Sequence, residues 1–115
     1  MNSKAKDKVW GLLCKQMDLQ KSVKNKTTLI GDALVSCDLY DIWDEKPKNH
    51  LSEWFERFWY RGFQATPEEL ITMHEQCSFC KQAYELIQER KIVKRKLSAT
   101  KGAITRIVSK SAGCV

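Results

Sequence analysis

TPEELITMHEQCSFCKQAYELI, residues 66–87, is the stretch that decides the fold. Thr66 can cap a helix, Pro67 suits the first helical position, and Glu69 completes a capping box. Apolar side chains then recur at alternating spacings of three and four residues, namely Leu70, Met73, Cys77, Cys80, Tyr84 and Ile87. Because this is the period of one helix face, the stretch predicts a single amphipathic helix that begins at Pro67.

Three further helices are expected upstream. The spacing of Val9, Trp10, Leu13 and Met17 predicts one helix over residues 4–22 with these side chains on its apolar face. A second helix is expected from about residue 27 to 43, with a polar turn at 22–28 between the two. A third helix is expected between the N-cap Asn49 and Gly62. Its apolar positions are Leu51, Trp54, Phe55, Phe58 and Trp59. Because Glu68 and Glu69 at the start of the next helix would repel phosphate, we expect a helical hairpin here rather than a DNA-reading helix-turn-helix unit.

A heptad-like seam continues toward the C-terminus. Its apolar positions are Leu86, Val93, Leu97, Ile104 and Ile107. This spacing predicts a long helix with a break near residues 98–102, because Gly102 costs about 1 kcal/mol relative to alanine. The expected fold class is all-α, a small bundle of four to five helices with a long basic C-terminal helix. Residues 1–89 are the expected helical core domain, and residues 90–115 are a basic helical extension of that domain.

Composition and length narrow the class of protein. The chain has 115 residues, of which 43% are hydrophobic, and this suits one globular domain. Two prolines and five glycines are too few for the turns of most all-β folds. No apolar run approaches the roughly 20 residues that span a bilayer. Five irregularly spaced cysteines favour reduced thiols, so we expect a cytoplasmic protein that does not associate with a membrane.

Charge is segregated along the chain. Residues 1–26 have a net charge of +5 and residues 71–115 of +6, whereas residues 27–70 have −5. Residues 90–110 contain no Asp or Glu, and their basic side chains are Arg90, Lys91, Lys94, Arg95, Lys96, Lys101, Arg106 and Lys110. Because such a helix neutralises phosphates through counterion release, these eight residues are the predicted nucleic-acid-binding site. An acidic protein surface as the partner and a helix that is merely solvated are the two alternatives.

A block of aromatic residues occupies the third expected helix and the turn after it. Its members are Trp54, Phe55, Phe58, Trp59, Tyr60 and Phe63. Their helical spacing favours a place in the core. Because one helix face cannot cover all six, the alternative is an exposed patch that anchors a protein partner, a role in which Trp and Tyr are enriched.

Cysteine and histidine spacing raises the question of a metal. Cys77 and Cys80 form a Cys-x-x-Cys pair, His74 precedes them, and Cys37 is the preferred fourth ligand, with Cys14 and His50 as alternatives. On an unbroken helix, His74 and Cys80 would lie about 9 Å apart along the axis, which is too far for a shared ion. We therefore expect the thiols to pack in the core and no cofactor to bind, with zinc as the first alternative and redox chemistry as the second.

The sequence offers little support for catalysis. Neither His50 nor His74 belongs to an arrangement typical of a catalytic triad, and there is no glycine-rich phosphate loop. Short, aromatic-rich and basic at one end, the chain resembles in general character the small accessory proteins of bacteriophages and prophages. That resemblance implies a regulator, inhibitor or adaptor that acts on a nucleoprotein machine.

These observations together predict a function class and an assembly. We expect a small non-enzymatic regulatory protein that binds nucleic acid or a nucleoprotein machine through its basic C-terminal helix, with no small-molecule substrate. The alternative is a protein-binding adaptor or inhibitor, for example of a host-defence or phage-packaging complex, that uses the aromatic and acidic middle. A homodimer is expected because one short chain need not cover the whole C-terminal seam.

Overall fold

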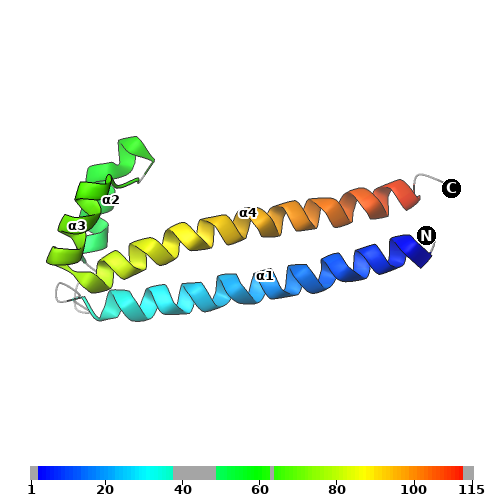
Figure 1. Cartoon of the computed structure of the whole chain (residues 1–115), viewed down its shortest axis with the longest axis horizontal. Helices are drawn as coiled ribbons and strands as arrows, with labels where there is room; N and C mark the ends of the chain where they lie inside the picture. The colour runs from blue at the N-terminus through cyan, green and yellow to red at the C-terminus, as the bar shows by residue number, and fades with distance from the viewer. Residues whose placement is uncertain (1–2, 38–48, 63, 113–115) are drawn as a thin grey trace. The chain divides into compact units, whose positions relative to one another are not determined.

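A computed structural model describes residues 3–37, 49–62 and 64–112. The elements are helix α1 (Ser3–Val35), helix α2 (His50–Phe58), the short 3₁₀ helix η1 (Trp59–Arg61), helix α3 (Pro67–Gln76) and helix α4 (Ser78–Ala112), as labelled in Figure 1. None of the described residues lies in a strand. The predicted all-α class is therefore confirmed.

Helix α1 is continuous where the sequence predicted two helices and a turn. Residues 22–28 are helical, so the predicted turn is wrong. Most buried and half-buried positions keep one register of alternating four- and three-residue spacings, which runs along the helix and ends at Cys37 just after it, namely Ala5, Val9, Leu12, Gln16, Leu19, Val23, Lys26, Ile30, Ala33 and Cys37. Because no Gly or Pro interrupts residues 22–28, their polar composition does not end the helix. Trp10 and Met17, which were expected on the apolar face, are exposed.

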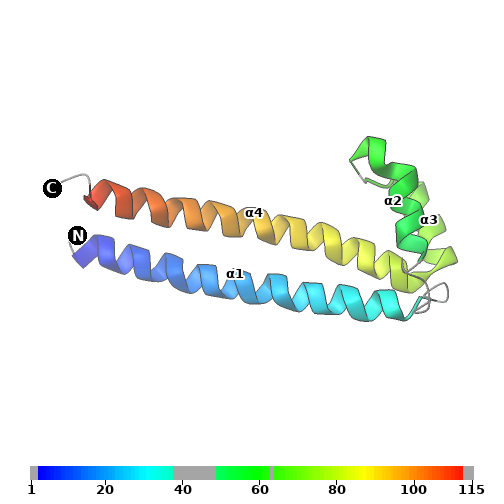
Figure 2. The same ribbon diagram turned by 180° about the vertical axis from the view of Figure 1, so that it is seen from behind.

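The chain divides into two compact units. Met1–Asn25 and Glu89–Val115 form the first, the hairpin unit, and Lys26–Gln88 form the second, the core unit. Within the hairpin unit, the first part of α1 and the last part of α4 run side by side in opposite directions (Figures 1 and 2). The predicted domain boundary between residues 89 and 90 stays a prediction, but the C-terminal segment packs with residues 1–25.

A heptad seam runs along the hairpin unit. On α1 it contains the half-buried Val9, Leu12 and Leu19, and on α4 it contains the half-buried Val93, Leu97, Ile104 and Ile107 with the buried Thr100. The spacing is that of an antiparallel coiled coil. Helix α4 continues through Gly102, so the expected break near residues 98–102 is wrong. Seam positions on both sides of the glycine keep the helix packed there.

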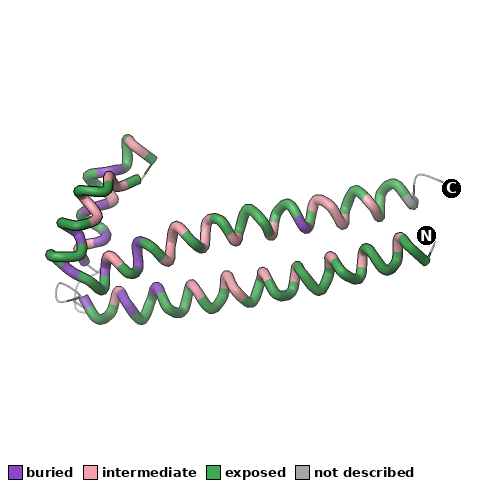
Figure 3. Tube along the Cα trace, in the orientation of Figure 1, coloured by how far each residue is buried: buried purple, intermediate pink, exposed green. Residues whose placement is uncertain are grey.

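The core unit holds most of the fully buried side chains (Figure 3). Its hydrophobic core consists of Ile30, Ala33, Cys37, Leu51, Trp54, Phe58, Met73, Cys77, Cys80, Ala83 and Tyr84. Two buried aromatic residues also satisfy their polar atoms. Trp54 Nε1 donates to Gln76 Oε1 at 3.0 Å, and the Tyr84 hydroxyl accepts from the Ala65 amide at 3.0 Å. These contacts fix α2 against α3 and the segment before α3 against α4.

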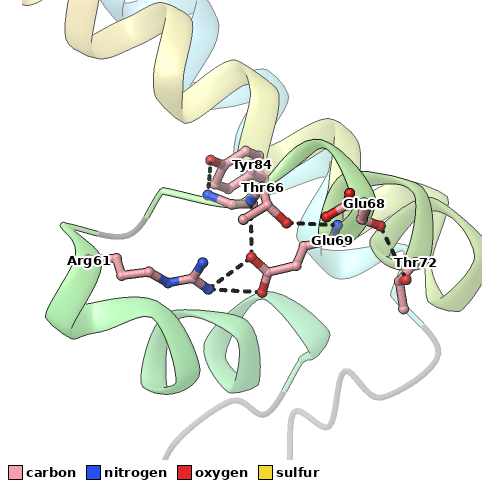
Figure 4. Close-up of polar contacts among 7 residues, drawn as sticks. Arg61, Thr66, Glu68, Glu69, Thr72 and Tyr84 are labelled. Atoms are coloured by element: carbon pink, nitrogen blue, oxygen red, sulfur yellow. Dashed lines mark hydrogen bonds and ion pairs between the residues drawn. The ribbon is translucent and has the colours of Figure 1, made fainter.

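The predicted helix caps of the core unit are confirmed. The Asn49 side chain accepts from the Ser52 amide at 2.8 Å, and Gly62 ends η1 with a positive φ of 68°. Thr66 accepts from the Glu69 amide at 3.2 Å while Glu69 accepts from the Thr66 amide at 3.0 Å, which completes the capping box (Figure 4). Arg61 donates to Glu69 at 2.9 Å, and this bond, together with the Thr66 amide, lowers the pKa of Glu69 to about 2.

Replacement of Thr66 by alanine is expected to lower the free energy of unfolding by about 1 kcal/mol. The substitution removes the side-chain oxygen that accepts from the Glu69 amide and leaves the first turn of α3 without that cap. Urea unfolding of the two proteins measures the difference. Thr72→Ala is the control, because the Thr72 hydroxyl lies on the exposed face of the same helix and donates only to the Glu68 carbonyl. Equal losses in both variants would contradict the capping role.

A helix break at Cys77 is the feature of the core unit that the sequence did not predict. The single helix expected over residues 67–87 is wrong, because α3 ends at Gln76 and α4 begins at Ser78. Cys77 between them is extended, with φ −161° and ψ 103°. Its amide still donates to the Met73 carbonyl at 2.9 Å, and its own carbonyl accepts from the Lys81 amide at 3.1 Å. Both helix ends therefore keep their backbone hydrogen bonds although the chain turns.

Candidate functional site

Four potential metal ligands converge in the core unit from three parts of the chain. Cys37 follows the C-terminus of α1, where its amide donates to the Leu34 carbonyl at 3.2 Å. His50 is the first residue of α2, directly after the cap residue Asn49. Cys77 lies at the break between α3 and α4, and Cys80 lies in the first turn of α4. Helix ends thus position all four side chains.

The four side chains form a compact cluster of donor atoms. The three thiol sulfurs and one ring nitrogen of His50 all lie within 4.8 Å of one another. The Cys37 sulfur lies 3.2 Å from His50 Nδ1, and the Cys80 amide donates to the Cys77 sulfur at 3.5 Å. All three cysteines are buried, and His50 is half-buried. A cluster of this composition and size could hold a metal ion.

The surroundings of the cluster disfavour a charged thiol in the absence of a cation. Burial, together with hydrogen bonds with Cys37 and Cys77, raises the pKa of the Cys80 thiol to about 12, although a backbone hydrogen bond with Leu51 acts in the opposite direction. A bound divalent cation inverts this balance, because a coordinating thiol is deprotonated outright. The cluster is therefore chemically suited to a soft cation rather than to a free thiolate nucleophile.

Sequence reasoning identified only part of this cluster. It placed Cys37, Cys77 and Cys80 together, but it took His74 as the third ligand and counted His50 among the alternatives. His74 lies exposed on α3 and does not belong to the cluster, and Cys14 lies exposed on α1 in the hairpin unit. The argument from an unbroken helix is wrong, because the break at Cys77 redirects the two cysteines. The expectation that Cys77 and Cys80 are buried in the core is confirmed.

The predicted nucleic-acid-binding residues all lie on α4 within the hairpin unit. Arg90 and Lys91 are half-buried, and the others are exposed, namely Lys94, Arg95, Lys96, Lys101, Arg106 and Lys110. The neighbouring part of α1 adds the exposed lysines Lys4, Lys6, Lys8, Lys15, Lys21 and Lys24. These α1 lysines were noticed as a basic end of the sequence, but they were not included among the predicted contacts.

The two basic ends of the sequence come together in one unit, so that charge is divided between the two units. The hairpin unit contains 14 Lys and Arg against three Asp and Glu, a net charge of +11. The core unit contains six basic and 11 acidic residues, a net charge of −5. Within the hairpin unit, Lys15 of α1 and Lys96 of α4 line the same groove, together with Leu12, Ala99, Thr100 and Ala103. The groove therefore presents positive charge from both helices.

The aromatic block is divided between core and surface. Trp54 and Phe58 are buried, which leaves them no surface for a partner, and Phe55 is half-buried. Trp59 and Tyr60 are 67% and 69% exposed. The Arg61 guanidinium lies over the Phe58 ring at 4.9 Å and over the Tyr60 ring at 5.7 Å. Phe63 lies outside the described residues. A partner could thus contact Trp59 and Tyr60 of the predicted six.

Comparison of the chain with protein-family models, with curated proteins and with solved structures finds no match. In the part of the chain that the structure describes, no helix is both long enough and apolar enough to cross a membrane.

Proposed function

We propose that this chain is a non-enzymatic nucleic-acid-binding protein that contacts the phosphate backbone through the hairpin unit. The observation that carries the proposal is the charge partition, +11 on the hairpin unit against −5 on the core unit. A surface of this charge releases condensed counterions when it meets a polyanion, and this supplies affinity without any reading of base sequence. The acidic core unit would be repelled from the same polyanion, so the charge partition also favours one orientation.

The dimensions of the basic surface suit a duplex. The part of α4 in the hairpin unit extends from Glu89 to Ala112, which is 24 residues. At about 1.5 Å per residue it is about 36 Å long. One turn of B-form DNA is about 34 Å long, so a helix lying along the duplex spans the length of roughly one turn. The basic C-terminal helix of the sequence-based prediction is therefore retained in the proposal, and the lysines of α1 are added to it.

Contact with phosphate rather than with base edges is the binding mode that these residues favour. Lysine side chains dominate the exposed basic positions of both helices. Lysine acts as a point charge, whereas specific base contacts are made mainly by the bidentate groups of Arg, Asn and Gln. A role as a regulatory component of a nucleoprotein machine, which needs affinity for nucleic acid more than sequence discrimination, is compatible with this mode.

A protein-binding adaptor is the second candidate, and one observation favours it. Trp59 and Tyr60 project from the acidic core unit with two thirds or more of their surface exposed. Exposed Trp and Tyr are the residue types that most often anchor a protein interface. Given the −5 charge of the core unit, the partner in this case would have a basic surface.

The proposal is tested by measuring how tightly the full-length chain binds a fluorescently labelled 20-base-pair DNA duplex and the matching RNA duplex. Fluorescence anisotropy gives the affinity at several salt concentrations. The variant Lys94→Ala, Arg95→Ala, Lys96→Ala is expected to bind more weakly and to show a flatter dependence on salt. The slope of log K against log salt should fall by about one for each phosphate contact that is lost.

The matched control keeps the charge at the same three positions. Lys94→Arg, Arg95→Lys, Lys96→Arg should retain the wild-type affinity, because a counterion-release surface depends on charge rather than on side-chain identity. Undiminished binding in the alanine variant would remove α4 from the interface. Duplex binding that is lost on Trp59→Ala with Tyr60→Ala, but not in the alanine variant, would place the interface at the aromatic pair instead of α4. No duplex binding by the wild type would favour the adaptor.

Self-association is a separate proposal. The seam that suggested a homodimer is half-buried within the hairpin unit of a single chain. Trp10 and Met17 remain exposed on the same unit, at 69% and 67%. Two hairpin units that pack through this apolar surface would form a four-helix bundle. Sedimentation at micromolar concentration distinguishes monomer from dimer.

A further inference from the structure

We infer that Cys37, His50, Cys77 and Cys80 form a structural Zn²⁺ site in the core unit. This inference is independent of the proposed nucleic-acid binding, because it concerns the other unit of the chain. It rests on the identity of the four donors, their mutual distances, their burial and the positions of the helix ends that carry them.

The donor set selects the metal. Three thiols and one imidazole are soft or borderline ligands, and no carboxylate of a described residue joins them in the cluster. Ca²⁺ and Mg²⁺ require oxygen ligands, so these donors disfavour them. Tetrahedral Cys₃His coordination is an established structural zinc arrangement. Because four protein ligands fill the tetrahedron, no position remains open for water or substrate, which separates this site from a catalytic one.

The distances are close to those that zinc requires. A Zn–S bond of about 2.3 Å places the sulfurs of a tetrahedral site about 3.8 Å apart. The donor atoms of the cluster already lie within 4.8 Å of one another. The upper limit of these distances exceeds the zinc value by about 1 Å, so small shifts of the donor atoms would complete the tetrahedron. The ligand positions are thus largely preformed.

Core packing alone does not account for the arrangement. Buried thiols pack well as small apolar groups, and Cys77 and Cys80 do lie in the core. A core-packing role does not require a polar imidazole nitrogen to face the sulfurs, yet His50 Nδ1 lies 3.2 Å from the Cys37 sulfur. Core packing also does not require the helix to break at Cys77, yet the backbone of Cys77 is extended between α3 and α4. A shared ion explains both features.

The metal would cross-link the three chain segments of the core unit. It joins the end of α1, the start of α2 and the junction of α3 with α4, which are separated by 13 and 27 residues in the sequence. Among the described residues, the hydrophobic core contains 11 buried side chains, of which three are cysteines. Small cores of this kind are commonly reinforced by a metal or by disulfides. The zinc is therefore expected to supply folding energy rather than chemistry.

In the first experiment, the full-length chain is purified without an affinity tag that binds metal, equilibrated with ZnCl₂ and passed through gel filtration. The zinc that remains bound to the protein is then measured. We expect about one zinc per chain in the wild type. Cys77→Ser and His50→Ala should lose it. Cys14→Ser and His74→Ala are the matched controls and should keep it, because Cys14 is an exposed thiol and His74 an exposed imidazole outside the cluster.

Cobalt substitution keeps the test decisive if a ligand-deletion variant fails to fold. Wild-type protein loaded with Co²⁺ should give the intense visible bands of a tetrahedral ion together with thiolate-to-cobalt charge-transfer absorption. His50→Cys, which preserves four ligands, should stay folded, keep the metal and increase the charge-transfer absorption by about one third, from three thiolates to four. A wild type that retains no zinc, octahedral cobalt spectra, or equal metal loss in the His74→Ala control would each overturn the site.

Discussion

Chelation of zinc is expected to lower the thermal unfolding midpoint of the full-length chain by at least about 10 °C. A ligand present at 100 times its dissociation constant stabilises the native state by about 2.7 kcal/mol, and structural zinc is commonly bound more tightly than that. For a domain of this size each kcal/mol shifts the midpoint by about 4–8 °C. The unfolding midpoint should fall on addition of EDTA and should recover on addition of excess ZnCl₂.

Removal of the zinc should also change the spectroscopic signal of aromatic side chains in the core unit. Trp54 is 2% exposed and its ring lies 6.1 Å from that of His50, so disruption of the site changes its surroundings directly. Near-ultraviolet circular dichroism, which reports fixed aromatic side chains, should collapse on chelation. The Cys14→Ser variant should respond to EDTA as the wild type does. Identical unfolding midpoints with and without EDTA, in a protein that contains zinc, would contradict a structural role for the metal.

Reversal of charge in the groove of the hairpin unit is the second large effect that we expect. Lys15→Glu combined with Lys96→Glu replaces two cations that line one groove by two anions, one on each helix. The net charge of the unit falls from +11 to +7. Two phosphate contacts become repulsive, so duplex affinity at low salt should fall by at least about tenfold, since each lost contact removes about one unit of salt slope. Fluorescence anisotropy with the labelled duplex measures this fall.

The controls separate local charge from fold and from overall charge. Lys15→Arg with Lys96→Arg should bind as the wild type does. Arg57→Glu changes a basic residue exposed on α2 in the core unit and should leave binding nearly unchanged. Circular dichroism should show equal helicity in all three variants, because both groove lysines are exposed. Loss of binding only when Arg57 is changed would move the interface to the core unit and contradict the proposal.

Local signals in the sequence predicted those features of the fold that depend on local chemistry. Asn49, Gly62 and Thr66 act at helix ends as expected, because a cap is decided by one side chain and the few amides next to it. The continuity of α1 was missed because its seam includes Gln16 and Lys26, polar residues whose stems can cover apolar surface. The more hydrophobic positions nearby, Trp10 and Met17, are exposed and suggested the wrong face.

The metal cluster was only partly predictable, for a related reason. The apolar stripe from Leu70 to Ile87 keeps helical spacing through Cys77, and no Gly or Pro marks the break there. His74 was favoured over His50 because it lies near the Cys-x-x-Cys pair in sequence. Proximity in space is instead set by the cap at Asn49, which places His50 at the start of α2. The one signal in the sequence that pointed to His50 was its position directly after the helix cap Asn49.

Lysine footprinting of the full-length chain with and without DNA duplex tests the central claim most directly. Exposed lysines are acetylated by a limiting reagent, and the extent at each site is measured by mass spectrometry. Lys15, Lys94 and Lys96 of the hairpin unit should be protected by duplex at low salt and released at high salt. Lys81 of the core unit, which pairs with Glu85 at 2.6 Å, should react equally with and without duplex at each salt concentration. Protection of Lys81 with none at Lys15, Lys94 and Lys96 would contradict the proposal that the hairpin unit is the nucleic-acid interface.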